Sequence, residues 1–159
     1  MGDSNLERMI RLAEEFFGTR NDPTQISVNE EVMARLQQIH PATVSEERDE
    51  QGPIAWMLVI PTTHELMEQF IAKAINEQEL LAKTLPGCTY DAIYLCSALV
   101  LPEHRGGGIA KKLVGRAIES IRKEHPIKYL FYWGFSVEGE KLATNVAREF
   151  GLPLYSRPE

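Results

Sequence analysis

The sequence predicts an α+β fold with a mixed, mostly antiparallel sheet flanked by helices, and three observations lead to this class. Two helical stretches precede the first strand-like segments. These first two strand-like segments are joined by the turn Asp49-Glu-Gln-Gly52, which is typical of an antiparallel hairpin. An apolar run from Ala92 to Leu101 then leads through glycines into a helix and a further strand, and this order favours parallel pairing with a right-handed crossover.

Cap signals and apolar periodicity define the helices that precede the sheet. Ser4-x-x-Glu7 is a capping box, and it begins a first helix that we expect to stop at Gly18. Ser27-x-x-Glu30 begins a second helix in the same way. The residues expected to face inward are Leu6, Met9, Ile10, Ala13, Phe16 and Phe17 in the first helix, and Val32, Met33, Leu36 and Ile39 in the second.

The middle of the chain predicts a hairpin and then one long helix. Residues 43–48 form a polar strand of an edge type, and residues 54–60 form an apolar strand buried on both faces. Thr62-x-x-Glu65 opens the helix, and Pro86-Gly87 ends it.

The last third of the chain alternates strands and helices. We expect a central strand over 91–101, its helix over 108–124 and an aromatic strand over 128–134. Ser136 or a neighbour caps a final helix that ends before Gly151, and residues 152–155 make one short strand. The whole chain, 1–159, is therefore expected to be a single domain.

Composition excludes several classes of function. With 43% apolar and 25% charged residues, the chain has the composition of an ordinary globular domain. No apolar run approaches the roughly 20 residues of a membrane span, and Met1–Asn5 lacks the features of a signal peptide, so we expect a cytoplasmic protein without a membrane partner. A net charge of -6 argues against nucleic acid and is compatible with a cationic amine. Cys88 and Cys96 are expected to be reduced thiols, and the four histidines lack metal-ligand spacing, so no metal is expected.

The glycine turn between the central strand and its helix is the chemically informative stretch. A helix start leaves backbone N–H groups without intrahelical partners, and glycines let a phosphate approach them closely. Arg105 and Lys111 flank the turn with positive charge. Neither the Walker loop nor the dinucleotide-binding fingerprint fits the spacing. The alternative is that Gly106-Gly107-Gly108 only reverses the chain between strand and helix.

The run Arg105-Gly-Gly-Gly-Ile-Ala110, preceded by Val100-Leu-Pro102, resembles the acetyl-CoA signature of the GNAT superfamily of N-acetyltransferases. The resemblance implies a GNAT-like fold in which the central parallel strands, near 92–101 and 128–134, splay apart around the cofactor. It also implies acetyl-CoA as a co-substrate, with the pyrophosphate held by backbone amides of the loop and the pantetheine arm held by the strand before it. The residues implied are Arg105, Gly106, Gly107, Gly108, Ile109 and Ala110 for the pyrophosphate, with Lys111 beside them, and Leu99, Val100 and Leu101 for the pantetheine.

Two residue types that many members of the superfamily use in catalysis are missing. The tyrosine that protonates the departing thiolate is replaced by Ala147, and no carboxylate lies between Asp91 and Glu103, where several members place a general base. Tyr94, Ser97 and Tyr132 are the remaining candidates for moving a proton.

By resemblance, the expected function is transfer of an acetyl group from acetyl-CoA to an amine of a small molecule or a protein. A CoA-binding module without activity and a purely structural domain are the alternatives. About 30 residues separate the second strand of the hairpin from the central strand, where the family has a short turn. This helical insertion, at about 62–88, is expected to be either a lid over the acceptor site or a packing and dimer surface, which leaves a homodimer open.

Overall fold

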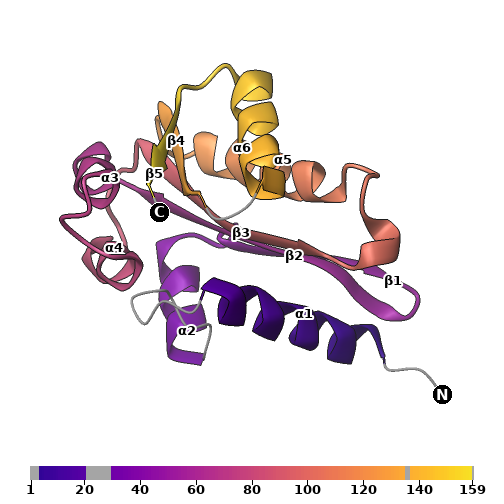
Figure 1. Cartoon of the computed structure of the whole chain (residues 1–159). Coiled ribbons are helices and arrows are strands. Elements are labelled where there is room, and N and C mark those ends of the chain that lie inside the picture. Colours follow the sequence, from indigo (N-terminus) through magenta and orange to yellow (C-terminus); the bar gives the residue numbers. More distant parts are fainter. Residues whose placement is uncertain (1–3, 21–29, 135–136, 159) are drawn as a thin grey trace.

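Five strands form one sheet whose spatial order, β1-β2-β3-β4-β5, follows the chain (Figure 1). The computed structural model describes residues 4–20, 30–134 and 137–158. The elements within these residues are α1 (Asn5–Arg20), α2 (Glu30–Ile39), β1 (Val44–Asp49), β2 (Gly52–Thr62), α3 (His64–Ile71), α4 (Glu77–Lys83), β3 (Ala92–Val100), the short 3₁₀ helix η1 (Pro102–His104), α5 (Ile109–Arg122), β4 (Tyr129–Trp133), α6 (Val137–Phe150) and β5 (Leu154–Arg157). The predicted α+β class is confirmed.

The sheet is mixed. β1 pairs with β2 and β2 with β3 in the antiparallel sense, whereas β3–β4 and β4–β5 are parallel. The antiparallel ladders contain more residue pairs than the parallel ones, as the sequence predicts. The two parallel connections run through α5 and α6, in accord with the crossover expected for consecutive parallel strands.

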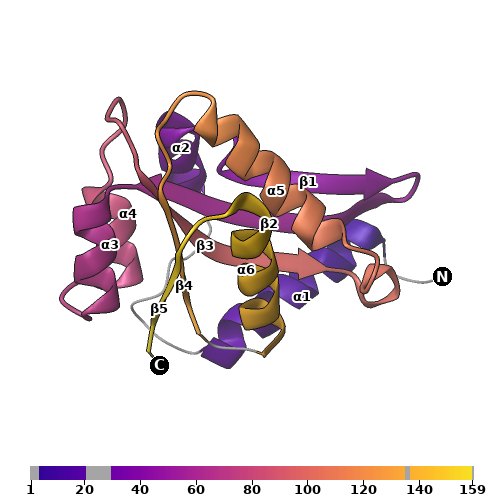
Figure 2. The same ribbon diagram turned by 90° about the horizontal axis from the view of Figure 1, so that it is seen from above.

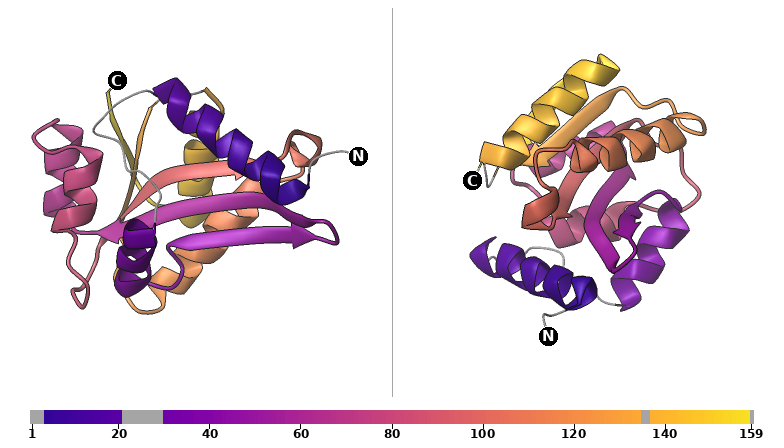
Figure 3. Two further views of the ribbon diagram at one scale, coloured as in Figure 1. Left: turned by 90° about the horizontal axis from the view of Figure 1, so that it is seen from below. Right: turned by 90° about the vertical axis from the view of Figure 1, so that its right-hand side faces the viewer.

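Helices cover both faces of the sheet. α1 and α2 lie on one face, and α5 and α6 lie on the other, as the views from above and below show (Figures 2 and 3). α3 and α4 sit at one end of the sheet, where α3 packs against β3 and β5. The main core contains buried residues of the strands and of α2, α3, α4, α5 and α6. The buried stripe of α5 consists of Leu113, Val114, Ala117, Ile118 and Ile121. The sequence carries the signal for this stripe, because its apolar residues recur at a spacing of three and four between Ile109 and Ile121.

β3 and β4 separate part-way along their length. Their pairing runs only from Ala92↔Tyr129 to Leu95↔Tyr132, while β3 continues to Val100 with β2 still beside it. Figure 2 shows β4 turning away from β3 beyond this point. A register shift against β2 leaves Cys96 as the extra residue of a β-bulge at the same position. We call the region where the strands part, from Cys96 to Val100, the fork; its splayed strands are those that the sequence predicts.

α1 presents a different stripe to the sheet from the one predicted. Met9 is fully buried, but Leu6 and Ile10 are about half exposed. Asn5 occupies the inward position instead, and its side-chain amide donates to Asp49 Oδ1 at 3.0 Å. The hydrogen bond lets a polar residue take a core position that the hydrophobic pattern assigns to leucine. Phe16 and Phe17 lie outside the residues whose side chains are described, as do the predicted caps Ser27 and Ser136.

The long helix predicted over the insertion is wrong, because the chain forms two short helices there. α3 ends at Ile71, and Lys73 adopts a left-handed conformation with φ of 64°. The Ala74 N–H then bonds back to the Gln69 carbonyl at 2.8 Å, which is the closing bond of a Schellman-type helix end. α4 begins afresh with Asn76 as its N-cap and Glu79 completing a capping box. Other boundaries shift by one or two residues: the cap of α3 is Thr63, α1 runs past Gly18 to Arg20, and β5 lies at Leu154–Arg157 rather than 152–155.

The left-handed lysine predicts a stabilising substitution. Lys73→Gly should raise the free energy of unfolding by about 0.5–1 kcal/mol in a urea titration, because glycine adopts this conformation without the clash at Cβ. Lys83→Gly, within α4, is the matched control and should lower it by a similar amount. Equal destabilisation by both substitutions would contradict the assigned break between the helices.

Candidate functional site

The glycine turn follows η1 and directs the chain from the C-terminal end of β3, the central strand, into α5. Gly106 and Gly108 have φ of 86° and 82°, a region that non-glycine residues rarely adopt, whereas Gly107 needs no such freedom. A Cβ added at Gly106 or Gly108 would meet no described atom within 4 Å, so the space in front of the turn is open. Gly108 is the N-cap of α5, and no side-chain cap bonds to the first turn. The N–H groups of this turn therefore remain available to an anion, with the positive end of the helix dipole behind them.

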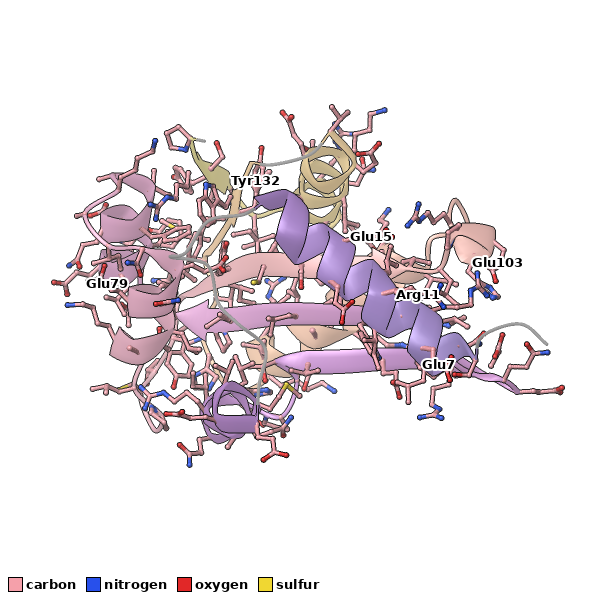
Figure 4. All side chains as sticks on the ribbon, turned by 60° about the horizontal axis from the view of Figure 1, so that its bottom comes forward. Glu7, Arg11, Glu15, Glu79, Glu103 and Tyr132 are labelled. Carbon is pink, nitrogen blue, oxygen red and sulfur yellow. The ribbon has the colours of Figure 1, made fainter. Side chains whose placement is uncertain are left out.

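Side chains from distant parts of the chain hold the turn in place. Arg8 of α1 donates two hydrogen bonds, of 2.6 and 2.5 Å, to the Glu103 carboxylate in η1. Nε2 of His104 lies 3.6 Å from Oδ2 of Asp49 in the hairpin. The other carboxylate oxygen of Asp49 accepts the hydrogen bond from the Asn5 side chain. Figure 4 shows Glu103 beside the N-terminal part of α1. The turn is thus tied to α1 and to the β1–β2 hairpin.

The charges that flank the turn are engaged in different ways. Arg105 is exposed, and its Nε donates to the Val100 carbonyl at 3.0 Å. Lys111 faces Glu149 of α6 at 3.3 Å, so a carboxylate partly offsets its charge. Lys112 is also exposed beside the turn, although it is not among the residues predicted to bind the cofactor.

At the fork, β3 offers backbone groups on the side that β4 has left. The Leu101 N–H bonds to the Ile54 carbonyl of β2, and Leu99 and Leu101 pack with Met9 under α1. Since backbone groups alternate in direction along an antiparallel strand, those of Val100 and Ala98 point away from β2. Of the predicted set Leu99–Leu101, Val100 is therefore the residue whose backbone groups face the fork. Ala98 joins it, and the alternation of an antiparallel strand is the signal that identifies it.

The start of α5 carries the remaining predicted residues of the loop. Ile109 and Ala110 are half-buried in its first turn, and Ile109 contacts both hydrophobic clusters. Their side chains anchor the helix start, while their backbone amides belong to the uncapped turn.

The three candidates for proton transfer lie around the fork but in different settings. Tyr94 is fully buried, with its ring stacked on Phe131 at 5.2 Å. Ser97 is half-buried on β3 just past the bulge, and Tyr132 is half-buried on β4 opposite Leu95, the last paired residue. Figure 4 places Tyr132 and Glu103 toward opposite ends of α1. Tyr94 and Ser97 thus lie on β3 on either side of the bulge, and Tyr132 lies on the neighbouring strand.

A buried carboxylate missed at the sequence level belongs to the same region. Glu77, the first residue of α4, has no exposed surface, and its Oε2 accepts from the Tyr94 hydroxyl at 2.5 Å. The Cys96 Sγ donates to the same oxygen at 3.7 Å. Glu77 was passed over because it lay within the long helix predicted there. The Asn76-x-x-Glu79 cap pattern is the signal that reveals a helix start at this point.

A family model described as the acetyltransferase (GNAT) family matches residues 7–152. The chain belongs to the GNAT family of acetyltransferases. A solved structure, the tetramutant of the BH1408 protein from Bacillus halodurans, is similar to this GNAT chain with 15% identity and a TM-score of 0.48, over 93% of this chain and 85% of that one. No curated protein matches the chain.

This GNAT chain departs from the family pattern in α6. Ala147, at the position of the family tyrosine, is buried and carries no hydroxyl. Among the described residues, no helix is both long and apolar enough to cross a bilayer. Nor do three His, Cys, Asp or Glu side chains of the described segments gather as metal ligands would.

The clamp on the glycine turn predicts a pH-dependent stability. Hydrogen bonds from Arg8 hold the pKa of Glu103 at about 2, below its ordinary value of 4.5. Because the folded-state pKa is the lower one, the ion pair stabilises the fold fully above pH 4.5 and loses that contribution as the pH falls toward 2. Glu103→Gln should therefore lower the melting temperature at pH 6, and the difference from wild type should vanish as the pH falls through this window.

Thermal denaturation between pH 1.5 and 7 checks this prediction. Glu50→Gln, an exposed residue of the hairpin turn, makes the same change of charge and should behave like wild type throughout. At pH 6, 1 M NaCl should reduce the effect of Glu103→Gln, since the pair is exposed and screened by salt. A difference between Glu103→Gln and wild type that is independent of pH would contradict the ion pair.

Proposed function

We propose that the protein transfers an acetyl group from acetyl-CoA to an amine of a small molecule or a protein. The observation that carries the proposal is the exposed, uncapped glycine turn at the start of α5, directly beyond the fork between β3 and β4. Backbone N–H groups at a helix start are suited to a pyrophosphate, and the missing Cβ atoms allow close contact. Membership of the GNAT family, which typically uses acetyl-CoA, supports the same assignment.

Each part of the site has a chemical task under this proposal. The amides of residues 106–110 and the Arg105 guanidinium bind the pyrophosphate, with Lys111 and Lys112 adding positive charge nearby. Backbone groups of Val100 and Ala98 hydrogen-bond the amides of the pantetheine arm. Acetyl-CoA supplies the thioester, which then lies at the closed end of the fork, near Tyr94, Ser97 and Tyr132. Holding amine and thioester together there lowers the entropy cost of the encounter, which is a large part of what such a site must do.

A CoA-binding module without transferase activity is the second candidate. Two observations favour it: the family tyrosine is replaced by the buried Ala147, and β3 carries no carboxylate. A panel of amines separates the two functions. Release of free thiol from acetyl-CoA with lysine, spermidine, glucosamine or a peptide with a free amino terminus supports transfer, whereas binding without release supports the module. For both the transferase and the CoA-binding module, we propose a cytoplasmic location.

Acetyl-CoA should raise the melting temperature. At a ligand concentration 100 times Kd, a ligand that binds only the native state adds about 2.7 kcal/mol, or roughly 5 °C or more for a chain of this size. Differential scanning fluorimetry measures the shift. Free pantetheine, which lacks the pyrophosphate, is the control and should give a much smaller one. Absence of a shift with both acetyl-CoA and CoA would contradict transferase and module alike.

A charge placed in the glycine turn should remove the binding. Gly108→Asp sets a carboxylate where the pyrophosphate would lie, and aspartate tolerates the left-handed conformation better than most residues. We expect affinity for CoA to fall at least tenfold, measured by calorimetry, with a native circular dichroism spectrum.

Gly87→Asp is the matched control for this variant. Gly87 also has φ of 82° and open space around it, but it lies after α4 and away from the turn. It should bear the same backbone cost and bind CoA like wild type. Unchanged CoA binding by Gly108→Asp would refute the assignment of the turn.

A further inference from the structure

Glu77 is the described acidic side chain most completely removed from water, and neither the family pattern nor the glycine turn accounts for it. Its exposed surface is 0%, and two of its contacts are with the β3 residues Tyr94 and Cys96. Burying a carboxylate costs several kcal/mol unless hydrogen bonds compensate. The Tyr94 hydroxyl and the Cys96 thiol supply two of them.

The position of this cluster coincides with the closed end of the fork. Cys96 is the bulged residue that follows the last β3–β4 pair, and it retains a small exposed area. Tyr94 and Cys96 contact the same carboxylate oxygen, so they share a face of the sheet. Cys96 is therefore the residue of this cluster that has some exposed surface, whereas Tyr94 and Glu77 have none.

The length of a pantetheine arm bound along β3 would place the thioester of acetyl-CoA near Cys96. β3 rises about 13 Å between Val100 and Cys96, at roughly 3.3 Å per residue. A pantetheine arm of roughly 14 bonds spans on the order of 15 Å when extended. An arm whose phosphate end is held beyond Val100 thus brings its sulfur to the region of Cys96.

The charged and titratable groups around Glu77 come from several elements. Tyr94 and Cys96 belong to β3. Arg157 of β5 donates to the Ile75 carbonyl, two residues before Glu77, and lies over the Phe70 and Trp133 rings at 4.5 and 4.9 Å. Arg35 of α2 donates to the carbonyls of Ala82 and Thr84 at the other end of α4. α4 is thus held in place from both ends, and its first carboxylate is fixed against β3.

We propose that Glu77, carried by the inserted helix α4, takes up the proton of the acceptor amine through Tyr94, and so supplies from another element the carboxylate that β3 lacks. This inference rests on the proposed transferase function. In the step, the nitrogen forms a bond to the thioester carbon, the C–S bond breaks, and CoA leaves as a thiolate that takes a proton from water. Because Tyr94 has no exposed surface, the nitrogen gives one proton to a water molecule beside Cys96, and that water passes a proton to the Tyr94 oxygen while the tyrosine's own proton moves to Glu77 Oε2. After product release, the proton returns by the same hydrogen bond and passes to solvent. Glu77 acts through Tyr94 and is therefore a positioning residue.

Four variants of the full chain test the proposal. Glu77→Gln keeps the shape and can still accept the Tyr94 hydroxyl, but it cannot take up a proton. Glu77→Asp restores a carboxylate, and Tyr94→Phe removes the connecting hydroxyl. Glu79→Gln is the control: it lies two residues along the same helix, it is exposed on the outer side of α4 (Figure 4), and glutamine also completes a capping box.

The readouts are melting temperature, the thermal shift with acetyl-CoA, and the pH profile of thiol release with the most reactive amine of the panel. We expect Glu77→Gln to melt at or above the wild-type temperature, since a buried charge is removed, and to keep the acetyl-CoA shift. Its kcat should fall about 100-fold, and the limb of the wild-type profile that reports deprotonation of the base should be lost. Glu77→Asp should recover part of the activity. Tyr94→Phe should match Glu77→Gln, and the double variant should be no slower than either, because the two residues act as a unit.

The opposite outcomes are equally defined. Three results would overturn the role of Glu77 while leaving the transferase assignment intact. The activity of Glu77→Gln could stay within twofold of wild type, its pH profile could be unaltered, or its loss of activity could follow a loss of melting temperature or of acetyl-CoA binding. A wild type that binds acetyl-CoA yet releases no thiol with any panel amine refutes this inference together with transfer, and leaves the CoA site standing. A wild type without an acetyl-CoA shift refutes the site itself.

Discussion

The architecture depends on one constraint: β3 loses its parallel partner after Leu95 while β2 continues to pair with it on the other side. Backbone N–H and C=O groups need hydrogen-bond partners. A central strand that directs half of these groups toward the fork, where no strand pairs with them, is therefore an unusual arrangement in a sheet. The bulge at Cys96 falls at the same position and changes the direction of the strand there. The crossover through α5 then begins at the open end of the fork. Strand divergence and helix start thus together create a site that neither would form alone.

The N-terminal helix contributes more than cover for the sheet. Met9 closes the small apolar cluster beneath Leu99 and Leu101, and Arg8 holds η1 through Glu103. Asn5 and His104 meet on Asp49, which joins the helix, the hairpin and the glycine turn in one polar network. A turn rich in glycine is costly to order, and these contacts restrict it before any ligand arrives. Preorganisation of the turn therefore depends on residues some hundred positions away in sequence.

Local sequence signals predicted the elements of this fold well and their contacts less well. The hairpin, the α5 stripe and the glycine turn each carry a short-range signal, such as a turn sequence, a period of 3.6 or a cap. In the predicted stripe of α1, Met9 is buried but Leu6 and Ile10 were wrong, because a side-chain hydrogen bond allows the polar Asn5 to take an inward position. The break after Ile71 was missed because Lys73 has no intrinsic preference for a left-handed helix end. Glu77 was invisible for a related reason: whether a glutamate lies in water or against a strand depends on where tertiary packing sets its helix.

The hydrogen bond from Arg105 to the Val100 carbonyl has a thermodynamic consequence. The same acceptor would serve an amide of an incoming pantetheine arm, so the guanidinium acts as an internal competitor for that carbonyl. Ligand entry would exchange one donor for another and release the arginine toward the phosphates. The number of bonds at the strand would then stay constant, and the enthalpy of association would come mainly from the anionic end of the cofactor.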